Sequence, residues 1–203
     1  MGLTERDKKF YDFLVSTRLP MTITDVAKMF YPSVSNNERS SIVVAQRRCR
    51  ALVKMDYIEC SKRNFGESNY YYVGVAPAQR TVRHKLTMSS VIAKIATSGF
   101  EILEIEPEYS FSDYGIVSDL YMTCKYANKP FIAIVEVDLT KDLNPNYKAL
   151  IEAIRSGKLK FKYPVYFLSV SDFKIKDDFL KKYFINVKTD LSDFEKFKYA
   201  FIK

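Results

Sequence analysis

The chain has 203 residues, of which 47% are apolar and 28% are charged. This composition is that of a folded globular protein and excludes wholesale disorder, and the length suits one large domain or two small ones. No stretch of the sequence approaches the roughly 18–20 apolar residues that a membrane span needs. Charged residues occupy positions 5–9, where an export signal would need an apolar core, so we expect a cytoplasmic protein.

The net charge of +8, from 32 Lys and Arg against 24 Asp and Glu residues, is unevenly distributed along the chain. The segment Asn36–Arg63 carries 7 basic and 3 acidic residues, whereas residues 86–203 together hold an excess of only one positive charge. A concentrated basic excess favours a polyanionic partner, and nucleic acid is the first class to consider.

The cysteine and histidine content limits the other functions. Cys49, Cys60 and Cys124 are widely spaced and form no CxxC pair, and His84 is the single histidine of the sequence. This pattern does not suit a disulfide framework or a zinc site of Cys and His ligands. It fits a reducing compartment.

The first part of the chain reads as three helices followed by a pair of strands. We expect helices at Thr4–Thr17, with Thr4 as N-cap, at Thr22–Tyr31 and at Glu38–Met55, and strands at Tyr57–Cys60 and Asn69–Val73. This is the element order of a winged helix-turn-helix domain, whose third helix enters the major groove of DNA. We therefore predict a winged helix DNA-binding domain over residues 1–75.

The third predicted helix carries the basic residues. Its apolar stripe is expected at Ile42, Ala45, Cys49, Leu52 and Val53, which turns the polar side chains outward. Arginine suits guanine edges and phosphates, and glutamine suits adenine. The alternative is a solvated basic face on a helical bundle or a protein-docking module. The candidate DNA-binding residues are Ser40, Ser41, Gln46, Arg47, Arg48 and Arg50 on the helix and Lys62, Arg63 and Asn64 at the tip between the strands.

A short Pro- and Ala-containing stretch, Gly74–Gln79, separates the first part from a mixed α/β pattern over residues 76–203. The fold class expected for the whole chain is α+β, with a mixed central sheet in this second domain. The expected elements are a helix at Lys85–Thr97, strands at Glu101–Tyr109, Val117–Tyr126 and Pro130–Asp138, a helix at Pro145–Arg155, a strand at Pro164–Val170, a short helix at Asp177–Tyr183, a strand at Phe184–Val187 and a closing helix at Ser192–Phe201.

Three acidic residues fall near the ends of neighbouring strands of the second domain. Asp119 lies early in one strand, and Glu136 and Asp138 end the next on the same side of the sheet. Carboxylates gathered at one point repel each other unless a divalent cation such as Mg²⁺ joins them, and such an ion could activate water. The alternative is that Asp119 is a turn residue and the other two simply end a buried strand.

Several segments resemble the replication-relaxation family of plasmids and mobile elements in Gram-positive bacteria. The resemblance covers roughly residues 5–155, and the segments that carry it are RRCRALVKMDYIECS, TVRHKLTMSSVIAKI, VSDLYM, FIAIVEVDLTKDL and NYKALI. Members pair a winged helix with a domain marked by a histidine, a proline-aspartate pair, a strand ending in Glu-x-Asp and a helix with Lys and Tyr. The resemblance implies a sequence-specific accessory or regulatory protein that binds double-stranded DNA in replication, transfer or transcription, and we expect a homodimer that reads two half-sites.

The second domain of that family is similar to the restriction-endonuclease-like fold with its PD-(D/E)xK motif. The resemblance places Asp119 and Glu136 as the acids that hold Mg²⁺, with Asp138 in the place of the motif's lysine. Lys148, or Lys141, would supply a displaced ammonium group, and Ser118 replaces the motif's proline. Two alternatives follow: a divalent-metal-dependent nuclease or nickase using Asp119, Glu136, Asp138 and Lys148, or a domain retained for binding or dimerisation.

Overall fold

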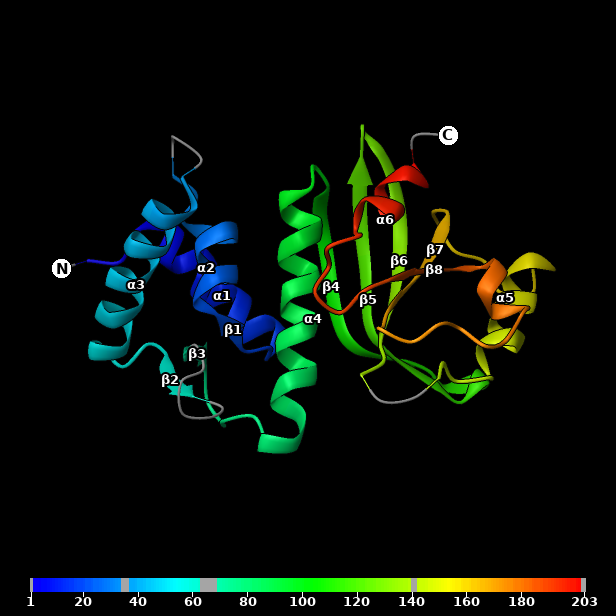
Figure 1. Cartoon of the computed structure of the whole chain (residues 1–203), viewed down its shortest axis with the longest axis horizontal. Helices are drawn as coiled ribbons and strands as arrows, with labels where there is room; N and C mark the ends of the chain where they lie inside the picture. The colour runs from blue at the N-terminus through cyan, green and yellow to red at the C-terminus, as the bar shows by residue number, and fades with distance from the viewer. Residues whose placement is uncertain (1, 34–36, 63–68, 140–141, 202–203) are drawn as a thin grey trace. The chain divides into compact units, whose positions relative to one another are not determined.

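The computed structural model of the chain describes residues 2–33, 37–62, 69–139 and 142–201 (Figure 1). The chain divides into two compact units, Met1–Thr97 and Ser98–Lys203, which are treated separately below. Helices and strands occur in both units, so the expected α+β class is confirmed. Within the ranges just given, no helix combines the length and the apolar character needed to cross a membrane.

The first unit alternates helices with short antiparallel strands. The three predicted helices and both predicted strands are present, and a two-residue strand, β1, joins them on the free side of β3 to give the sheet order β1-β3-β2. The elements are α1 (Glu5–Thr17), β1 (Met21–Thr22), α2 (Ile23–Phe30), α3 (Glu38–Lys54), β2 (Glu59–Lys62), β3 (Asn69–Tyr72) and α4 (Gln79–Thr97).

Helix α4 moves the boundary between the units from the expected 75/76 to 97/98. The helix begins at Gln79 rather than at Lys85, and it packs on α2 and β1. Its Ser89 hydroxyl donates to the carbonyl of Pro20 over 2.6 Å, and its Ser90 hydroxyl donates to the Asp25 carboxylate over 2.8 Å. These bonds tie α4 to the first unit, and they place His84 inside a helix rather than at its start.

A buried ion pair joins α1 to α3. Asp7 closes the capping box of α1 with Thr4, and the same carboxylate accepts hydrogen bonds from the Tyr31 hydroxyl (2.7 Å) and from Nε of Arg48 (3.0 Å), while Nη2 of Arg48 completes the pair. The side chains of Asp7, Tyr31 and Arg48 are all buried. Burial raises the pKa of Asp7, but the bonds from Arg48, Thr4 and Tyr31 outweigh it and hold that pKa well below its ordinary value.

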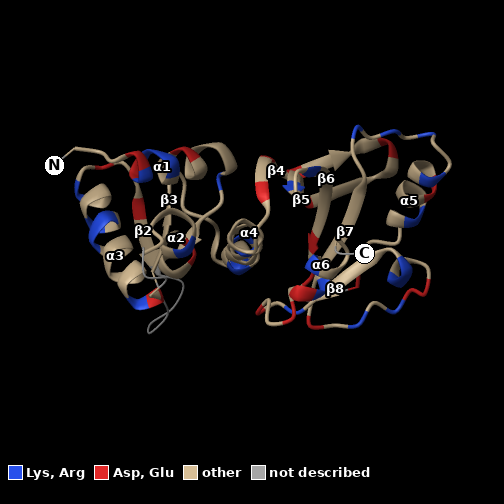
Figure 2. Cartoon of the chain, turned by 90° about the horizontal axis from the view of Figure 1, so that it is seen from above, with Lys and Arg blue, Asp and Glu red and all other residues tan. Residues whose placement is uncertain are grey.

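The buried face of α3 differs from the predicted stripe and corrects two of the candidate DNA-binding residues. Figure 2 shows basic residues recurring along α3, but Arg48 points inward to Asp7. Ser41 is also buried: its hydroxyl accepts from the Ser33 backbone N–H (2.9 Å) and donates to the Asn37 carbonyl (3.3 Å). The residues of α3 that are buried are Ser41, Ala45, Arg48, Cys49 and Leu52.

The second unit is built on one mixed five-stranded sheet, as predicted. Its order is β4-β5-β6-β7-β8, with antiparallel pairing between the first three strands and parallel pairing between the last three. The elements are β4 (Glu101–Phe111), a 3₁₀ turn η1 (Ser112–Tyr114), β5 (Ile116–Tyr126), β6 (Lys129–Val137), α5 (Tyr147–Arg155), β7 (Val165–Val170), a 3₁₀ turn η2 (Leu180–Lys182), β8 (Phe184–Val187) and α6 (Glu195–Tyr199). The predicted helix at Asp177–Tyr183 is reduced to η2.

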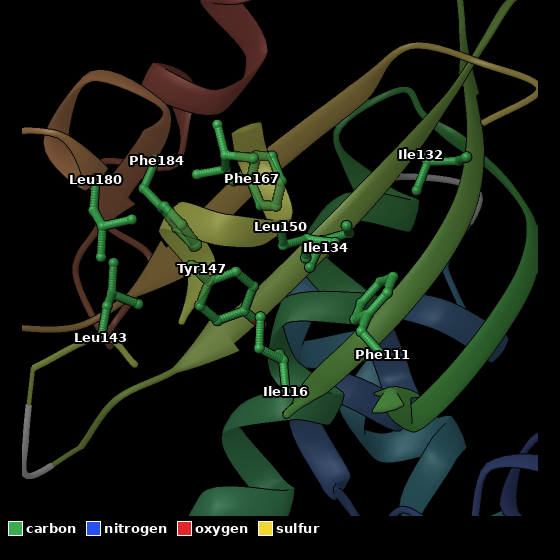
Figure 3. Packing of buried hydrophobic residues seen from close by; sticks show 11 residues of the cluster. Phe111, Ile116, Ile132, Ile134, Leu143, Tyr147, Leu150, Phe167, Leu180 and Phe184 are labelled. Carbon is green, nitrogen blue, oxygen red and sulfur yellow. The ribbon is translucent and has the colours of Figure 1, made fainter. Parts of the chain in front are cut away.

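The middle strand β6 organises the packing of this unit, because its apolar run is buried on both faces. On one face, Ile132 and Ile134 form a core with Tyr147 and Leu150 of α5 (Figure 3). On the other face, Phe131 packs against Phe197 of α6, with ring centroids 6.4 Å apart. Helix α5 is thereby held over the strand that carries Glu136.

The strand at one edge of the sheet, β4, has an exposed acidic side. Its exposed glutamates are Glu101, Glu104, Glu106 and Glu108. Pro107 lies among them, and the pairing with β5 is irregular between Ile102 and Glu104. Charge, proline and a bulge are the features that keep an edge strand from pairing with another chain.

The ion pair between α1 and α3 leads to a stability prediction. Replacing Arg48 by alanine leaves the buried Asp7 carboxylate without its counter-charge, so we expect the free energy of unfolding of the first unit to fall by about 3–5 kcal/mol. The exposed neighbour provides the control, since Arg47→Ala is expected to change it by less than about 0.5 kcal/mol. Urea unfolding followed by circular dichroism measures both, and equal effects of the two substitutions would contradict the assigned roles.

Candidate nucleic-acid interface and acidic cluster

The exposed face of α3 is a basic stripe that runs the length of the helix. We use the name α3 stripe for the outward-facing residues Arg39, Val43, Gln46, Arg47, Arg50 and Lys54. Their spacing repeats every three or four residues, which places them on one side of an α-helix, opposite the buried residues. Gln46 is half-buried and the other five are exposed.

The cations of the α3 stripe are available to an external anion. Arg39, Arg47, Arg50 and Lys54 make no ion pair with any residue in the described ranges, whereas Arg48 and Lys28 are engaged with Asp7 and Glu38. Four such cations on one helix face concentrate positive potential there.

The structure sorts the predicted DNA-binding residues into three groups. Ser40, Gln46, Arg47 and Arg50 are on the accessible side of α3, and Ser40 also donates its backbone N–H to the N-cap Asn37 over 3.2 Å. Ser41 and Arg48 are buried and serve the fold. Arg63, Asn64 and the side chain of Lys62 lie outside the described residues.

Two basic members of the α3 stripe, Arg39 and Lys54, are absent from the predicted set. Their signal is present in the sequence, because both continue the spacing of Arg47 and Arg50 along one helix face. Centring the predicted exposed face of α3 on Arg50, rather than on Arg47 and Arg48, would have included both residues.

The acidic residues of the second unit lie where β5 and β6 pair. Leu120 is registered with Val135, so Asp119 and Glu136 stand opposite each other at the next position and on the same face of the sheet. Asp119 Oδ2 accepts a hydrogen bond from the backbone N–H of Val137 over 2.6 Å. Two of the three predicted carboxylates are therefore brought together by the register itself.

The partner of Glu136 is a tyrosine from α5. The hydroxyl of Tyr147, a fully buried side chain in the first turn of that helix, donates to Oε1 of Glu136. Burial and the nearby Asp119 charge, opposed by this hydrogen bond, raise the pKa of Glu136 to about 8. Burial and the carboxylate also raise the pKa of Tyr147, so the phenol keeps its proton and remains the donor.

The other two predicted catalytic residues have different surroundings. Lys148 forms an ion pair with Asp177, with Nζ 2.6 Å from Oδ2, rather than with the carboxylate pair. Asp138 is buried just beyond β6 and, with Ser169 and Ser171, lines a hollow of about 10 Å³, which is space for about one water molecule. Lys141 lies outside the described residues.

These surroundings do not fit a ready-made magnesium site. In the part of the chain that the structure describes, no three His, Cys, Asp or Glu side chains are grouped so as to hold a metal ion. Asp119 and Glu136 each use one carboxylate oxygen to accept a hydrogen bond from the protein. The predicted ammonium group, that of Lys148, is paired with Asp177. The surroundings of Glu136 instead favour its protonated form.

Tyr147 belongs to this site but is absent from the set of site residues predicted from the sequence. Its position at the start of a helix that packs over the glutamate-bearing strand is the feature that could have identified it.

Comparison of the chain with protein-family models, with curated proteins and with solved structures finds no match. The interpretation of both sites therefore follows from the geometry described above.

The carboxylate pair makes stability depend on pH. The folded chain holds a proton on Glu136 that the unfolded chain releases near its ordinary pKa of 4.5, so the free energy of unfolding should fall as the pH rises from 4.5 to about 8. Glu136→Gln keeps an acceptor for Tyr147 and carries no charge, so it should flatten this decline, each pKa unit being about 1.4 kcal/mol.

Urea unfolding at several pH values, in buffer with EDTA, measures this dependence. Glu152→Gln is the matched control, because Glu152 is an exposed glutamate of the same helix that carries Tyr147. A decline that survives in Glu136→Gln, or one that Glu152→Gln removes equally well, would assign the effect to other groups.

Proposed function

We propose that the chain is a sequence-specific, double-stranded DNA-binding protein whose first unit is a winged helix. The α3 stripe enters the major groove, and the residues predicted from the sequence to lie at the tip between the strands, Lys62, Arg63 and Asn64, contact the flanking backbone. The resemblance to the replication-relaxation family adds the process: an accessory or regulatory role in replication, transfer or transcription of a plasmid or mobile element.

The element order supports the winged-helix assignment. The first unit runs α1-β1-α2-α3-β2-β3, with β1 added beside β3 in a three-stranded antiparallel sheet. In this order α3 follows a short helix and precedes the strand pair, as the recognition helix of such a domain does.

The observation that carries the proposal is the α3 stripe. It presents Arg47 and Arg50, whose guanidinium groups suit guanine edges or phosphates, beside Gln46, whose amide suits adenine. Arg39 and Lys54 stand near the two ends of the same face, where phosphates flank a helix lying in the groove. The ion pair of Arg48 with Asp7 supports this by holding α3 against α1 with the stripe turned outward.

The second unit has a non-catalytic role in this proposal. Its sheet order agrees with a restriction-endonuclease-like domain, but the candidate acids are engaged with protein groups. We assign it to dimerisation, which would place two winged helices on two half-sites of one duplex.

Removing two guanidinium groups from the α3 stripe tests the DNA-binding role. For Arg47→Ala with Arg50→Ala, we expect the affinity for duplex DNA to fall about tenfold or more. If both arginines contact phosphates, the slope of log affinity against log salt concentration should also become shallower by about two. Fluorescence anisotropy with a labelled duplex, over a series of salt concentrations, measures both quantities.

The control removes the same charge from the second unit. Lys158→Gln with Lys160→Gln alters two exposed lysines of the segment that follows α5 and should change neither quantity by a comparable amount. If the two double variants behave alike, net charge rather than the α3 stripe determines binding, and the proposed docking is wrong.

The engaged carboxylates lead to a separate prediction about cleavage. We expect the purified chain to leave supercoiled plasmid uncut with either Mg²⁺ or Mn²⁺, because Asp119, Glu136 and Lys148 are committed to Val137, Tyr147 and Asp177. Agarose electrophoresis of the plasmid measures this. Nicking that requires the metal and disappears in Glu136→Gln would instead establish the nuclease function.

A further inference from the structure

A hollow of about 490 Å³ lies in the first unit between α3 and the β2–β3 pair. We call it the α3–β2 hollow. Side chains from both elements line it, with Gln46, Arg50, Val53 and Lys54 contributed by α3 and Cys60 by β2. Its volume falls in the range of about 300–1,000 Å³ that small-molecule sites occupy.

The charged part of the α3–β2 hollow is entirely positive among the residues that line it. Arg50 and Lys54 lie one helical turn apart on α3, and neither has an ion-pair partner in the described ranges. Two cations facing one open volume attract an anion, and a guanidinium group binds a carboxylate, sulfonate or phosphate through two parallel hydrogen bonds.

The rest of the α3–β2 hollow is apolar or aromatic. Ile23 of α2, Val53 of α3 and Tyr71 of β3 line it, and Ile23 and Tyr71 are otherwise buried. A bare inorganic anion would leave the apolar part of the lining in contact with water. A ligand that covers it needs a hydrocarbon body, since burial of apolar surface stabilises binding in proportion to area.

We infer that the α3–β2 hollow is a binding site for a small organic anion with an apolar body. The anionic group lies between Arg50 and Lys54, and the apolar body covers Ile23, Val53 and Tyr71.

Occupation of the hollow would also regulate the α3 stripe. Gln46, Arg50 and Lys54 belong to both, so the ligand and a duplex compete for the same side chains, and each weakens the binding of the other by the same factor. This competition rests on the proposed DNA-binding function, whereas the site itself does not. The class of regulator that results is a small-molecule effector that releases the protein from DNA.

Two probes of the same shape test the site. 8-Anilinonaphthalene-1-sulfonate is an aromatic anion whose fluorescence rises on binding, and N-phenyl-1-naphthylamine is nearly the same molecule without the sulfonate. With the full chain, we expect one molecule of the sulfonate to bind per chain. In Arg50→Gln with Lys54→Gln its affinity should fall about tenfold or more, whereas the weaker binding of the neutral probe should stay the same.

Arg47→Gln is the matched control, because Arg47 belongs to the α3 stripe but does not line the hollow. It should weaken duplex binding and leave sulfonate binding unchanged. The proposed site would be wrong if the affinity for the sulfonate did not change in Arg50→Gln with Lys54→Gln. It would also be wrong if Arg47→Gln reduced that affinity equally. If only the duplex result fails, the proposed DNA-binding function is wrong and the ligand site stands.

Cys60 supplies an independent measurement. It is an exposed cysteine that lines the hollow, while Cys49 and Cys124 are buried. We expect the sulfonate to slow alkylation of Cys60 by iodoacetamide several-fold, as followed by peptide mass spectrometry, and to lose this effect in the double variant. Unchanged alkylation at a saturating concentration would show that the probe binds elsewhere and would overturn the proposal.

Discussion

The buried ion pair between Asp7 and Arg48 is the constraint on which the first unit depends. A carboxylate with no exposed surface needs a cation, and Arg48 of α3, the helix that also carries the candidate interface, supplies it. Because Arg48 must turn inward, the rotation of α3 about its axis is determined, and Arg47 and Arg50 on either side of it must turn outward. The ion pair that Arg48 makes inside the fold thus places Arg47 and Arg50 on the solvent side of α3.

The second unit also contains a buried acid with a protein partner. Here the partner of Glu136 is the phenol of Tyr147 rather than a cation. Glu136 and Asp119 face each other because of the strand register, and Tyr147 is carried to them by the helix that covers β6. Burial and the nearby Asp119 charge favour the protonated form of Glu136, whereas the hydrogen bond from Tyr147 lowers its pKa and only partly offsets them. Lys148, the predicted ammonium group, pairs with Asp177 instead.

Most of the architecture could be predicted from local pattern, and the errors have specific causes. The Thr4 cap, the apolar run of β6 and the mixed sheet follow from spacing and composition. The inward turn of Arg48 does not, because its partner Asp7 is 41 residues away in sequence and only the tertiary structure joins them. The first turns of α4 are polar, so the apolar pattern predicted its start at Lys85 rather than at Gln79. Strand β1 has only two residues, which is too short for an alternation of apolar and polar residues to be recognised.

The acidic edge of β4 has a consequence for assembly. Two copies of this edge would place rows of glutamates against each other, so the sheets of two chains should not join there into one continuous sheet. The same charges repel the phosphates of a duplex. In the dimer on DNA proposed above, the glutamate-bearing edge of β4 would therefore be directed away from both the partner chain and the nucleic acid, toward bulk water or a basic third component.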